Sequence, residues 1–403
     1  MKQRHKEVRL LFRFLLFLLL LTLTGCWSSR EIEDLGLVVG TALDLEKDKS
    51  REEALERNEK SYPDKAIMTI TNQLVTSQTT GAGKKEGGSQ QKAFKNVSES
   101  GDAIISILRD MILRIDKRAF AQHSKVIVIG EDLARTLNLQ QILDFFLREQ
   151  EIRPSSIILI AKNRASKTLE SKEPTVIPAL HLIQISKGQE RTTKILPPMP
   201  LAKLNGKLHS ESSFLLQNVS MKNGEVKFAG ASLIDGKAKK LRGFLNEKDL
   251  EGITWVTGKG KGGLVKSSDE KTGQPIIYEI ESMKSKIRPH VDGNNISFEI
   301  NISSEGRIAE NWVVSGKLSE NEFLKRAEKV SKKEVGRLVK NVLDKTQQEY
   351  KADVLGFGDQ LRIEYPKVWE KVKEDWDHTF SKIPIKYTIK LTIKDYGTSV
   401  SNK

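Results

Sequence analysis

The chain has 403 residues, with 67 Lys or Arg against 53 Asp or Glu and a formal net charge of +14. This length is sufficient for two or three domains. Its single cysteine excludes an internal disulfide framework and a zinc site built on several thiolates. The basic residues are mixed with acidic ones, and only 6% of the residues are aromatic, which argues against a nucleic-acid-binding protein.

Residues 1–25 have the three parts of an export signal. Basic residues outnumber the single acid, Glu7, and the run from Phe14 to Leu21 contains only Leu and Phe. The sequence Leu23-Thr24-Gly25-Cys26 follows this run. A helix that spans a bilayer needs about 20 apolar residues, so the run is too short for one. We therefore expect a signal peptide that is cut between Gly25 and Cys26.

The Leu-Thr-Gly-Cys ending resembles the bacterial lipobox, in which diacylglycerol is attached to the cysteine thiol. The alternatives are that Cys26 is a buried small side chain or belongs to an uncleaved anchor. The position of the only cysteine favours the lipobox, and two acyl chains are enough for stable anchoring. Without the signal the net charge is about +10. This charge fits a solvated surface and also suits attraction to anionic lipid headgroups.

The amino-terminal half predicts alternating strands and helices. Residues 48–64 and 76–91 are polar or charged and predict loops. The apolar pattern predicts strands at 66–74, 125–130 and 155–161 and helices at 102–115 and 138–149. Such alternation is typical of an α/β unit, and it leaves the strand directions open.

A proline-containing segment predicts a boundary between two globular halves. Pro197, Pro198 and Pro200 lie close together, and residues before proline resist helix formation. We expect a linker at 196–210. An α/β region at 26–195, which has room for two small domains, precedes it, and an α+β domain at 211–403 follows it.

The carboxy-terminal half predicts strands and long helices. Residues 296–302 and 383–393 alternate between apolar and polar side chains, which favours an antiparallel sheet. Ser319 and Glu322 form a capping-box pattern before a long apolar stripe, and a second helix is expected to start near Pro366. The predicted fold class is α+β, with mixed sheets and helices in several domains. In the carboxy-terminal half we expect an antiparallel sheet packed with long helices.

The sequence contains no strong catalytic or metal-binding pattern. The histidines are not at metal-ligand spacing, and residues 258–263 match a dinucleotide-binding glycine pattern only formally, because loop sequence follows them. Trp369 and Trp376 suit a ligand platform less well than core packing. Gly356 suits a helix end better than a metal loop. His123 precedes a buried strand, where a structural role is more typical than catalysis. We expect no cofactor and no metal.

Several motifs together resemble the Ger(x)C lipoproteins, the C subunits of bacterial spore germinant receptors. They are the start Cys26-Trp27-x-x-x-Glu31-Ile32, the sequence Gly40 to Asp44, the stretch from His123 to Glu131, the sequence Asp353-Val354-Leu355-Gly356-Phe357-Gly358-Asp359, and Pro366 with Trp369 and Trp376. The resemblance covers most of the mature chain. Ala42-Leu43 and the long charged loop at 48–64 depart from the usual pattern.

The resemblance implies a non-enzymatic, lipid-anchored protein on the outer face of the spore inner membrane or cell membrane. It implies integral membrane A and B subunits as partners, three small α+β domains, and a role in receptor assembly or coupling. Two alternatives remain from the residues themselves. One is a solute-binding lipoprotein of a transporter, and the other is a tethered cell-wall hydrolase.

Overall fold

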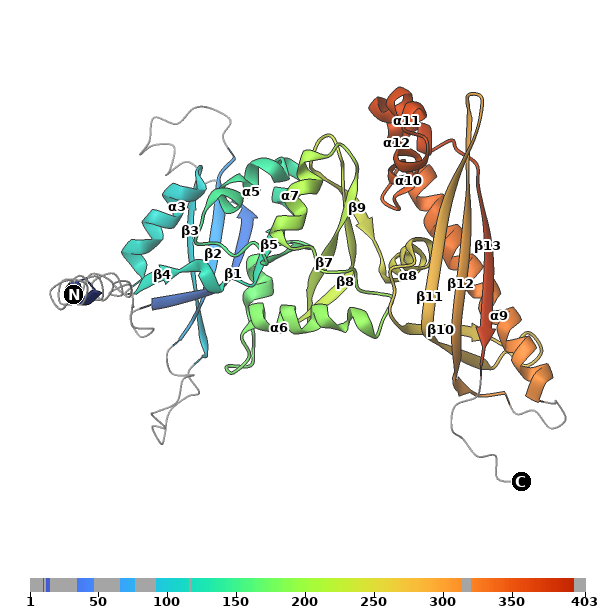
Figure 1. Ribbon diagram of the computed structural model, residues 1–403. Helices are drawn as coiled ribbons and strands as arrows, with labels where there is room; N and C mark the ends of the chain where they lie inside the picture. Colours follow the sequence, from blue (N-terminus) through green and yellow to red (C-terminus); the bar gives the residue numbers. More distant parts are fainter. Residues whose placement is uncertain are drawn as a thin grey trace, which may run out of the picture.

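The computed structural model describes residues 10, 12–14, 35–46, 66–76, 92–115, 117–313 and 320–394. Within these ranges the chain forms two sheets that lie side by side, with helix α8 (Glu247–Thr257) between them (Figure 1). The expectations for Gly25, Cys26, Trp27, Glu31 and Ile32, and for the capping box at Ser319, lie outside the described residues.

The first sheet contains strands from residue 35 to residue 245. Its strands are β1 (Leu35–Leu45), β2 (Met68–Val75), β3 (Phe94–Gly101), β4 (Arg118–Phe120), β5 (Val126–Gly130), β6 (Ile157–Ala161), β7 (Phe214–Lys222), β8 (Glu225–Ile234) and β9 (Leu241–Leu245). The strand order is β3-β2-β1-β5-β6-β7-β8-β9, and β4 pairs with the start of β1. The pairs from β1 to β7 along this path are parallel, and the outer pairs are antiparallel.

The central strands β5 and β6 confirm the strands expected from the apolar runs. Every residue of both strands is buried. The reason is that helices cover both faces of the parallel part of the sheet. One face packs against α3 (Ile104–Met111), α5 (Leu139–Arg148) and α7 (Leu201–His209), and the other packs against α6 (Pro178–Ser186).

The proline-containing segment 196–210, which we expected to be a linker, includes a helix. After Pro200 the chain forms helix α7, whose Leu201, Leu204 and Leu208 are buried in the core of the first sheet. Pro200 itself stands at the N-cap, where a missing backbone N–H costs nothing. The sheet also continues past this segment, because β6 pairs with β7. Where independently folding domains begin and end stays a prediction.

The second sheet has the order β10-β11-β12-β13. Its strands are β10 (Gly263–Ser268), β11 (Pro275–Asp292), β12 (Asn295–Asn311) and β13 (Ile385–Ile393). The first three strands are antiparallel, as expected, but β13 runs parallel to β12. Alternation of side chains shows which face is buried and does not encode direction. The direction follows from the connection, because the long helix α9 (Glu320–Asp344) carries the chain back along the sheet (Figure 1).

The segment between α9 and β13 contains more short helices than the sequence predicts. A π-helical turn at Lys345–Glu349 ends α9, and α10 (Phe357–Glu364), α11 (Pro366–Val372) and α12 (Trp376–Phe380) follow. Pro366 starts α11, as expected. Gly356, expected at a helix end, instead precedes the first residue of α10, with φ of 92°. Among the described residues, no helix combines the length and apolar character needed to cross a bilayer.

The two sheets share a continuous core, and the predicted α+β class is confirmed. Ala231 of β8 and Leu245 of β9 are buried in the same cluster as the second sheet and α9. Helix α8 begins with a capping box between Asn246 and Asp249 and ends at Gly258, which adopts the left-handed conformation. Helix α8 also packs closely against α9, because Gly252 lies against the backbone of Leu338.

Gly252→Ala should separate α8 from α9. A Cβ at this position would lie 2.5 Å from the carbonyl oxygen of Leu338 and 3.0 Å from the Val342 side chain. We expect the free energy of unfolding to fall by about 1–3 kcal/mol, as for other overpacked cores. Gly336→Ala in α9 is the matched control, because its Cβ would meet only Ile389 at 3.7 Å. Urea unfolding should show Gly336→Ala unchanged or more stable by about 0.5–1 kcal/mol, and equal effects at the two glycines would contradict the packing argument.

Candidate functional site

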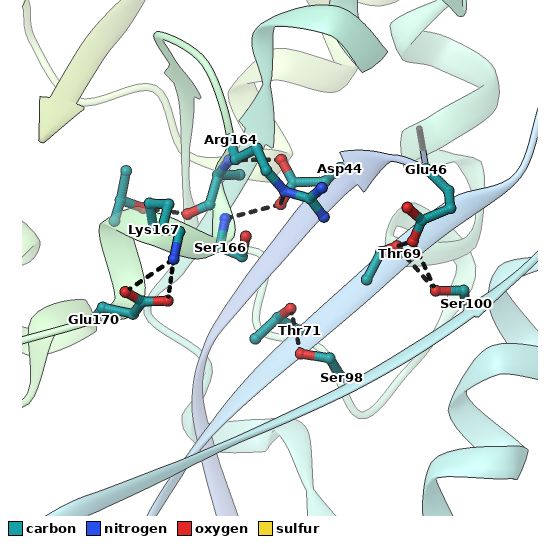
Figure 2. Close-up of polar contacts among 12 residues, drawn as sticks. Asp44, Glu46, Thr69, Thr71, Ser98, Ser100, Arg164, Ser166, Lys167 and Glu170 are labelled. Carbon is teal, nitrogen blue, oxygen red and sulfur yellow. Dashed lines mark hydrogen bonds and ion pairs between the residues drawn. The ribbon is translucent and has the colours of Figure 1, made fainter. Parts of the chain in front are cut away.

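Asp44, one of the family-motif residues, lies at the end of β1 and binds a backbone loop. Its side chain is buried, and its two oxygens accept hydrogen bonds from the backbone N–H groups of Ala165 (2.6 Å) and Ser166 (2.9 Å) (Figure 2). Arg164 lies 3.8 Å from the same carboxylate. These contacts hold the loop after β6 against the end of β1, and Gly130 leaves the necessary room, because a Cβ there would lie 2.4 Å from Asp44 Oδ1.

Polar side chains of β2 and β3 hold the same loop from the other side. The Gln73 amide donates to the Leu169 carbonyl at 2.7 Å and accepts from the Ala179 N–H at 2.9 Å. Asn96 also donates to Leu169. Gln73 is fully buried, so these bonds satisfy groups that water cannot reach. Sequence reasoning missed Gln73 and Asn96, because their partners are far away in the chain.

Glu46 forms a separate buried cluster beside this loop site. Its Oε2 accepts hydrogen bonds from the hydroxyls of Thr69 (2.6 Å) and Ser100 (3.3 Å), which come from β2 and β3 (Figure 2). These bonds cross three neighbouring segments of the first sheet. The Asp44 and Glu46 carboxylates are therefore both engaged in holding the fold together.

The second motif cluster is built around the carboxylate of Asp353. Oδ1 accepts from the backbone N–H groups of Leu355, Gly356 and Phe357 at 3.1, 2.9 and 3.2 Å. Oδ2 accepts from the N–H of Gly358 at 2.6 Å and from the indole of Trp376 at 2.9 Å. Five donors thus surround one buried carboxylate, and this arrangement fixes the turn that begins α10.

The aromatic residues of the motif pack on the same turn. The rings of Trp369 and Trp376 lie 5.3 Å apart in an edge-to-face arrangement. Gly358 lies beneath them, because a Cβ there would be 2.6 Å from the Trp376 indole nitrogen and 3.0 Å from the Trp369 ring. Phe357 is fully buried, with its ring 4.9 Å from that of Phe298 in β12. The structure therefore brings Gly356, Phe357, Gly358, Trp369 and Trp376 together.

Asp377 connects this cluster to the first sheet. Its Oδ1 accepts from the backbone N–H of Asp353 at 3.0 Å, and its Oδ2 accepts from the hydroxyl of Ser213 at 2.9 Å. Ser213 directly precedes β7 and also accepts from the N–H of Gly236. Burial raises the pKa of the Asp377 carboxyl above its ordinary value. We call the group of Ser213, Asp353, Trp376 and Asp377 the junction.

A cavity of about 230 Å³ borders the junction. Its lining includes Asp353, Gly356, Asp359 and Trp376, together with Lys203, Lys207 and Lys259. Desolvation and the charges of Lys203 and Lys207 lower the pKa of Lys259, while Asp359 acts in the opposite direction. The lining therefore has three lysines against two aspartates, a small excess of basic side chains that suits a small anion.

The remaining motif residues do not join either cluster. His123 ends a short turn before β5, and its ring lies 5.7 Å from that of Phe120. It stands at the opposite end of β5 from Gly130 and Asp44. Among the described residues, no group of three or more His, Cys, Asp or Glu side chains is placed to hold a metal ion. The two clusters around Asp44 and Asp353 instead hold backbone segments in place through hydrogen bonds to N–H groups.

Asp44→Ala should leave two backbone donors without partners. Each buried donor left unpaired costs about 1–3 kcal/mol, so we expect the free energy of unfolding to fall by at least about 2 kcal/mol. Glu170→Ala is the control on the same loop. Its pair with Lys167 is exposed on both sides, at 60% and 53%, and should contribute less than about 1 kcal/mol. Chemical unfolding followed by circular dichroism measures both, and a loss at Asp44 no larger than that at Glu170 would contradict the role of this carboxylate.

Asp377→Asn should not weaken the junction at neutral pH. The amide oxygen still accepts from Asp353, its NH₂ group can donate to Ser213, and the buried charge is gone. The native state holds the Asp377 proton to higher pH than the unfolded chain, so the wild type loses stability as pH rises from the ordinary aspartate pKa through the raised one. We therefore expect Asp377→Asn to be as stable as the wild type or more so at pH 7. The difference should vanish below about pH 4.

Asp377→Ala is the matched comparison, because it removes both hydrogen bonds. It should lose about 1–3 kcal/mol at pH 7. Thermal unfolding at several pH values separates the three proteins. An Asp377→Asn protein as weak as Asp377→Ala would show that the negative charge itself holds the junction.

Two family models match consecutive parts of the chain. One, described as the spore germination protein N-terminal domain, matches residues 28–221. The other, described as spore germination B3/GerAC like, C-terminal, matches residues 229–397. Neither border falls in the segment 196–210. The second model includes the whole of the Asp353 cluster.

Known spore germination proteins are similar to this chain along nearly its whole length. The chain is 47% identical to spore germination protein YndF of Bacillus subtilis (strain 168) over 385 residues, which are 94% of this chain and 95% of that protein. It is 32% identical to spore germination protein B3 of the same organism, over 95% of this chain and 97% of that protein.

A solved structure shares the fold. The crystal structure of the GerBC protein matches with a TM-score of 0.59 and 29% sequence identity, over 81% of this chain and 94% of that chain. The shared fold, the two family models and the full-length relatives agree with the motifs at Asp44 and Asp353. The chain belongs to the Ger(x)C family of spore germination proteins.

Proposed function

We propose that this chain is a lipid-anchored, non-enzymatic C subunit of a nutrient germinant receptor. It is held by diacylglycerol on Cys26 at the outer face of the spore inner membrane or cell membrane. There it contacts integral membrane A and B subunits and acts in receptor assembly or coupling. Family membership supports the receptor, and the lipobox-like sequence supports the anchor.

The use of the motif carboxylates is the observation that carries the non-enzymatic part of the proposal. The carboxylates of Asp44 and Asp353 accept hydrogen bonds from backbone N–H groups that they position. A general acid or base must instead reach a proton of the substrate. The most family-specific residues of the chain therefore serve the shape of the protein, which suits a subunit that works through protein contacts.

Cys26→Ala should release the protein from the membrane. Without the thiol, no diacylglycerol can be attached. We expect the protein to move to the soluble fraction, and germination through its receptor to fail or weaken. Ser29→Ala, three residues further on, is the control and should stay in the membrane fraction.

Fractionation of spores with immunoblotting, together with germination assays, checks this prediction. Normal membrane retention of Cys26→Ala would show that the tether is something else. If deletion of the gene left every nutrient response intact, the receptor role itself would be wrong. Identification of the proteins that accompany the tagged chain from the membrane tests the proposed A and B partners directly.

The cationic cavity beside the junction favours a second candidate, a solute-binding lipoprotein. Its volume of about 230 Å³ suits a small molecule, and its lysines suit a carboxylate. Calorimetry of the chain with amino acids and sugars distinguishes the two functions. Micromolar binding that Lys207→Ala abolishes and Lys222→Ala preserves would favour solute binding by this chain alone.

A further inference from the structure

Helix α3 has apolar side chains on two faces. Ile104, Ile107 and Met111 are buried against the first sheet. The neighbouring face presents Ile105 and Ile112, which are 45% and 63% exposed. The sequence pattern places all of them in one helical segment, but a helix can bury only one face against a sheet. The second face is therefore left to contact something else.

The exposed face continues into the turn after the helix. Leu113, in the short turn Ile112–Arg114, is 87% exposed. We call Ile105, Leu108, Ile112 and Leu113 the α3 face. The other large apolar side chains that are exposed in the described part after the predicted signal, Leu264, Trp312 and Ile363, occur singly in the second half of the chain. Single exposed apolar residues are ordinary, whereas a cluster indicates a contact surface.

An apolar hollow deepens this surface. Its volume is about 560 Å³, and Ile105, Leu108 and Ile112 are among the side chains that line it. Ile115, Ala119 and Phe145 extend the apolar lining, and Asn72, Arg109, Lys117, Glu149 and Glu151 are among its polar residues. The apolar area open to water is thus larger than the α3 face alone.

The α3 face lies near the point where the anchored segment joins the fold. Strand β4 pairs with the first residues of β1, with Arg118 opposite Leu35. Arg118 is five positions after Leu113, a stretch that spans about 17 Å at most. Leu35 is nine positions after Cys26, a stretch that spans about 30 Å at most. Figure 1 shows α3 and β4 at the end of the molecule that is farthest from the second sheet.

The charges around the face suit an anionic lipid surface. Among the described side chains of residues 104–118, Arg109, Arg114 and Lys117 are basic and Asp110 is acidic, and Arg114 forms an ion pair with Glu99. Apolar side chains flanked by basic ones are the composition of segments that lie in the headgroup region of a bilayer. Glu149 and Glu151 border the hollow, so the apolar side chains must supply much of the binding.

We propose that the α3 face rests on the membrane, with Ile112 and Leu113 inserted among the lipid headgroups. The first sheet then stands on the bilayer by its α3 end, and the second sheet with the junction projects away from it. This inference rests on the lipid anchor proposed above. It adds a defined contact and a defined orientation, whereas a flexible tether alone would leave the molecule free to turn.

A single fluorophore at Leu113 tests the contact. Because the only cysteine carries the lipid in the proposed mature protein, Leu113→Cys supplies one free thiol for a polarity-sensitive dye. The lipidated full-length mature chain is placed in phosphatidylcholine vesicles with about one third phosphatidylglycerol, with or without spin-labelled lipids. Ile363→Cys in α10 is the matched control, since Ile363 is also exposed, at 64%, but lies in the second half of the chain.

We expect a blue shift and at least twofold quenching by the spin-labelled lipids at position 113, and neither at position 363. Vesicles without phosphatidylglycerol should give weaker quenching at position 113. If the protein floats with the vesicles while position 113 is as unquenched as position 363, the inference is wrong and the anchor stands. If the protein does not float at all, the anchor itself is wrong. Quenching at both positions would overturn the proposed orientation.

Discussion

The carboxylate of Asp353 is the interaction on which the second half of the molecule depends. It gathers four backbone N–H groups and the Trp376 indole around one buried group. The first N–H groups of a helix have no partner within the helix, and the Asp353 carboxylate satisfies them at the start of α10. Gly356 adopts a positive φ in this turn, and Gly358 leaves room for both tryptophans. The residue types of the motif thus follow from one geometric demand.

The same group ties the second half to the first. Asp377 accepts from the backbone of Asp353 and from Ser213, which precedes β7. The apolar core continues past this point through Ala231 and Leu245 of the first sheet. A boundary crossed by both a polar network and a continuous core resists independent motion of its two sides. Such a connection between the two sheets suits the coupling role proposed above.

The sequence indicates elements more reliably than it indicates partners. The runs Val126 to Gly130 and Ile157 to Ala161 predict buried strands, because their apolar character is local. The bonds from Asp44 to Ala165 and Ser166 join residues more than a hundred positions apart, and no local pattern encodes them. The direction of β13 also escapes prediction, because alternation of side chains is the same for either direction. Pro200 does not distinguish a linker from a helix start, since proline is as suitable before a helix as in a linker.

A charged group at the junction calls for a physical explanation, because an apolar core would hold the two sheets together at lower cost. Removing a carboxylate from water costs several kcal/mol, and its hydrogen bonds only repay that cost when every donor is in place. Apolar contacts tolerate small rotations, whereas the five donors around Asp353 meet its oxygens in only one arrangement. The carboxylate therefore contributes a unique orientation of α10 relative to α12 more than it contributes stability. For the coupling role proposed above, a defined orientation of these elements would offset that cost.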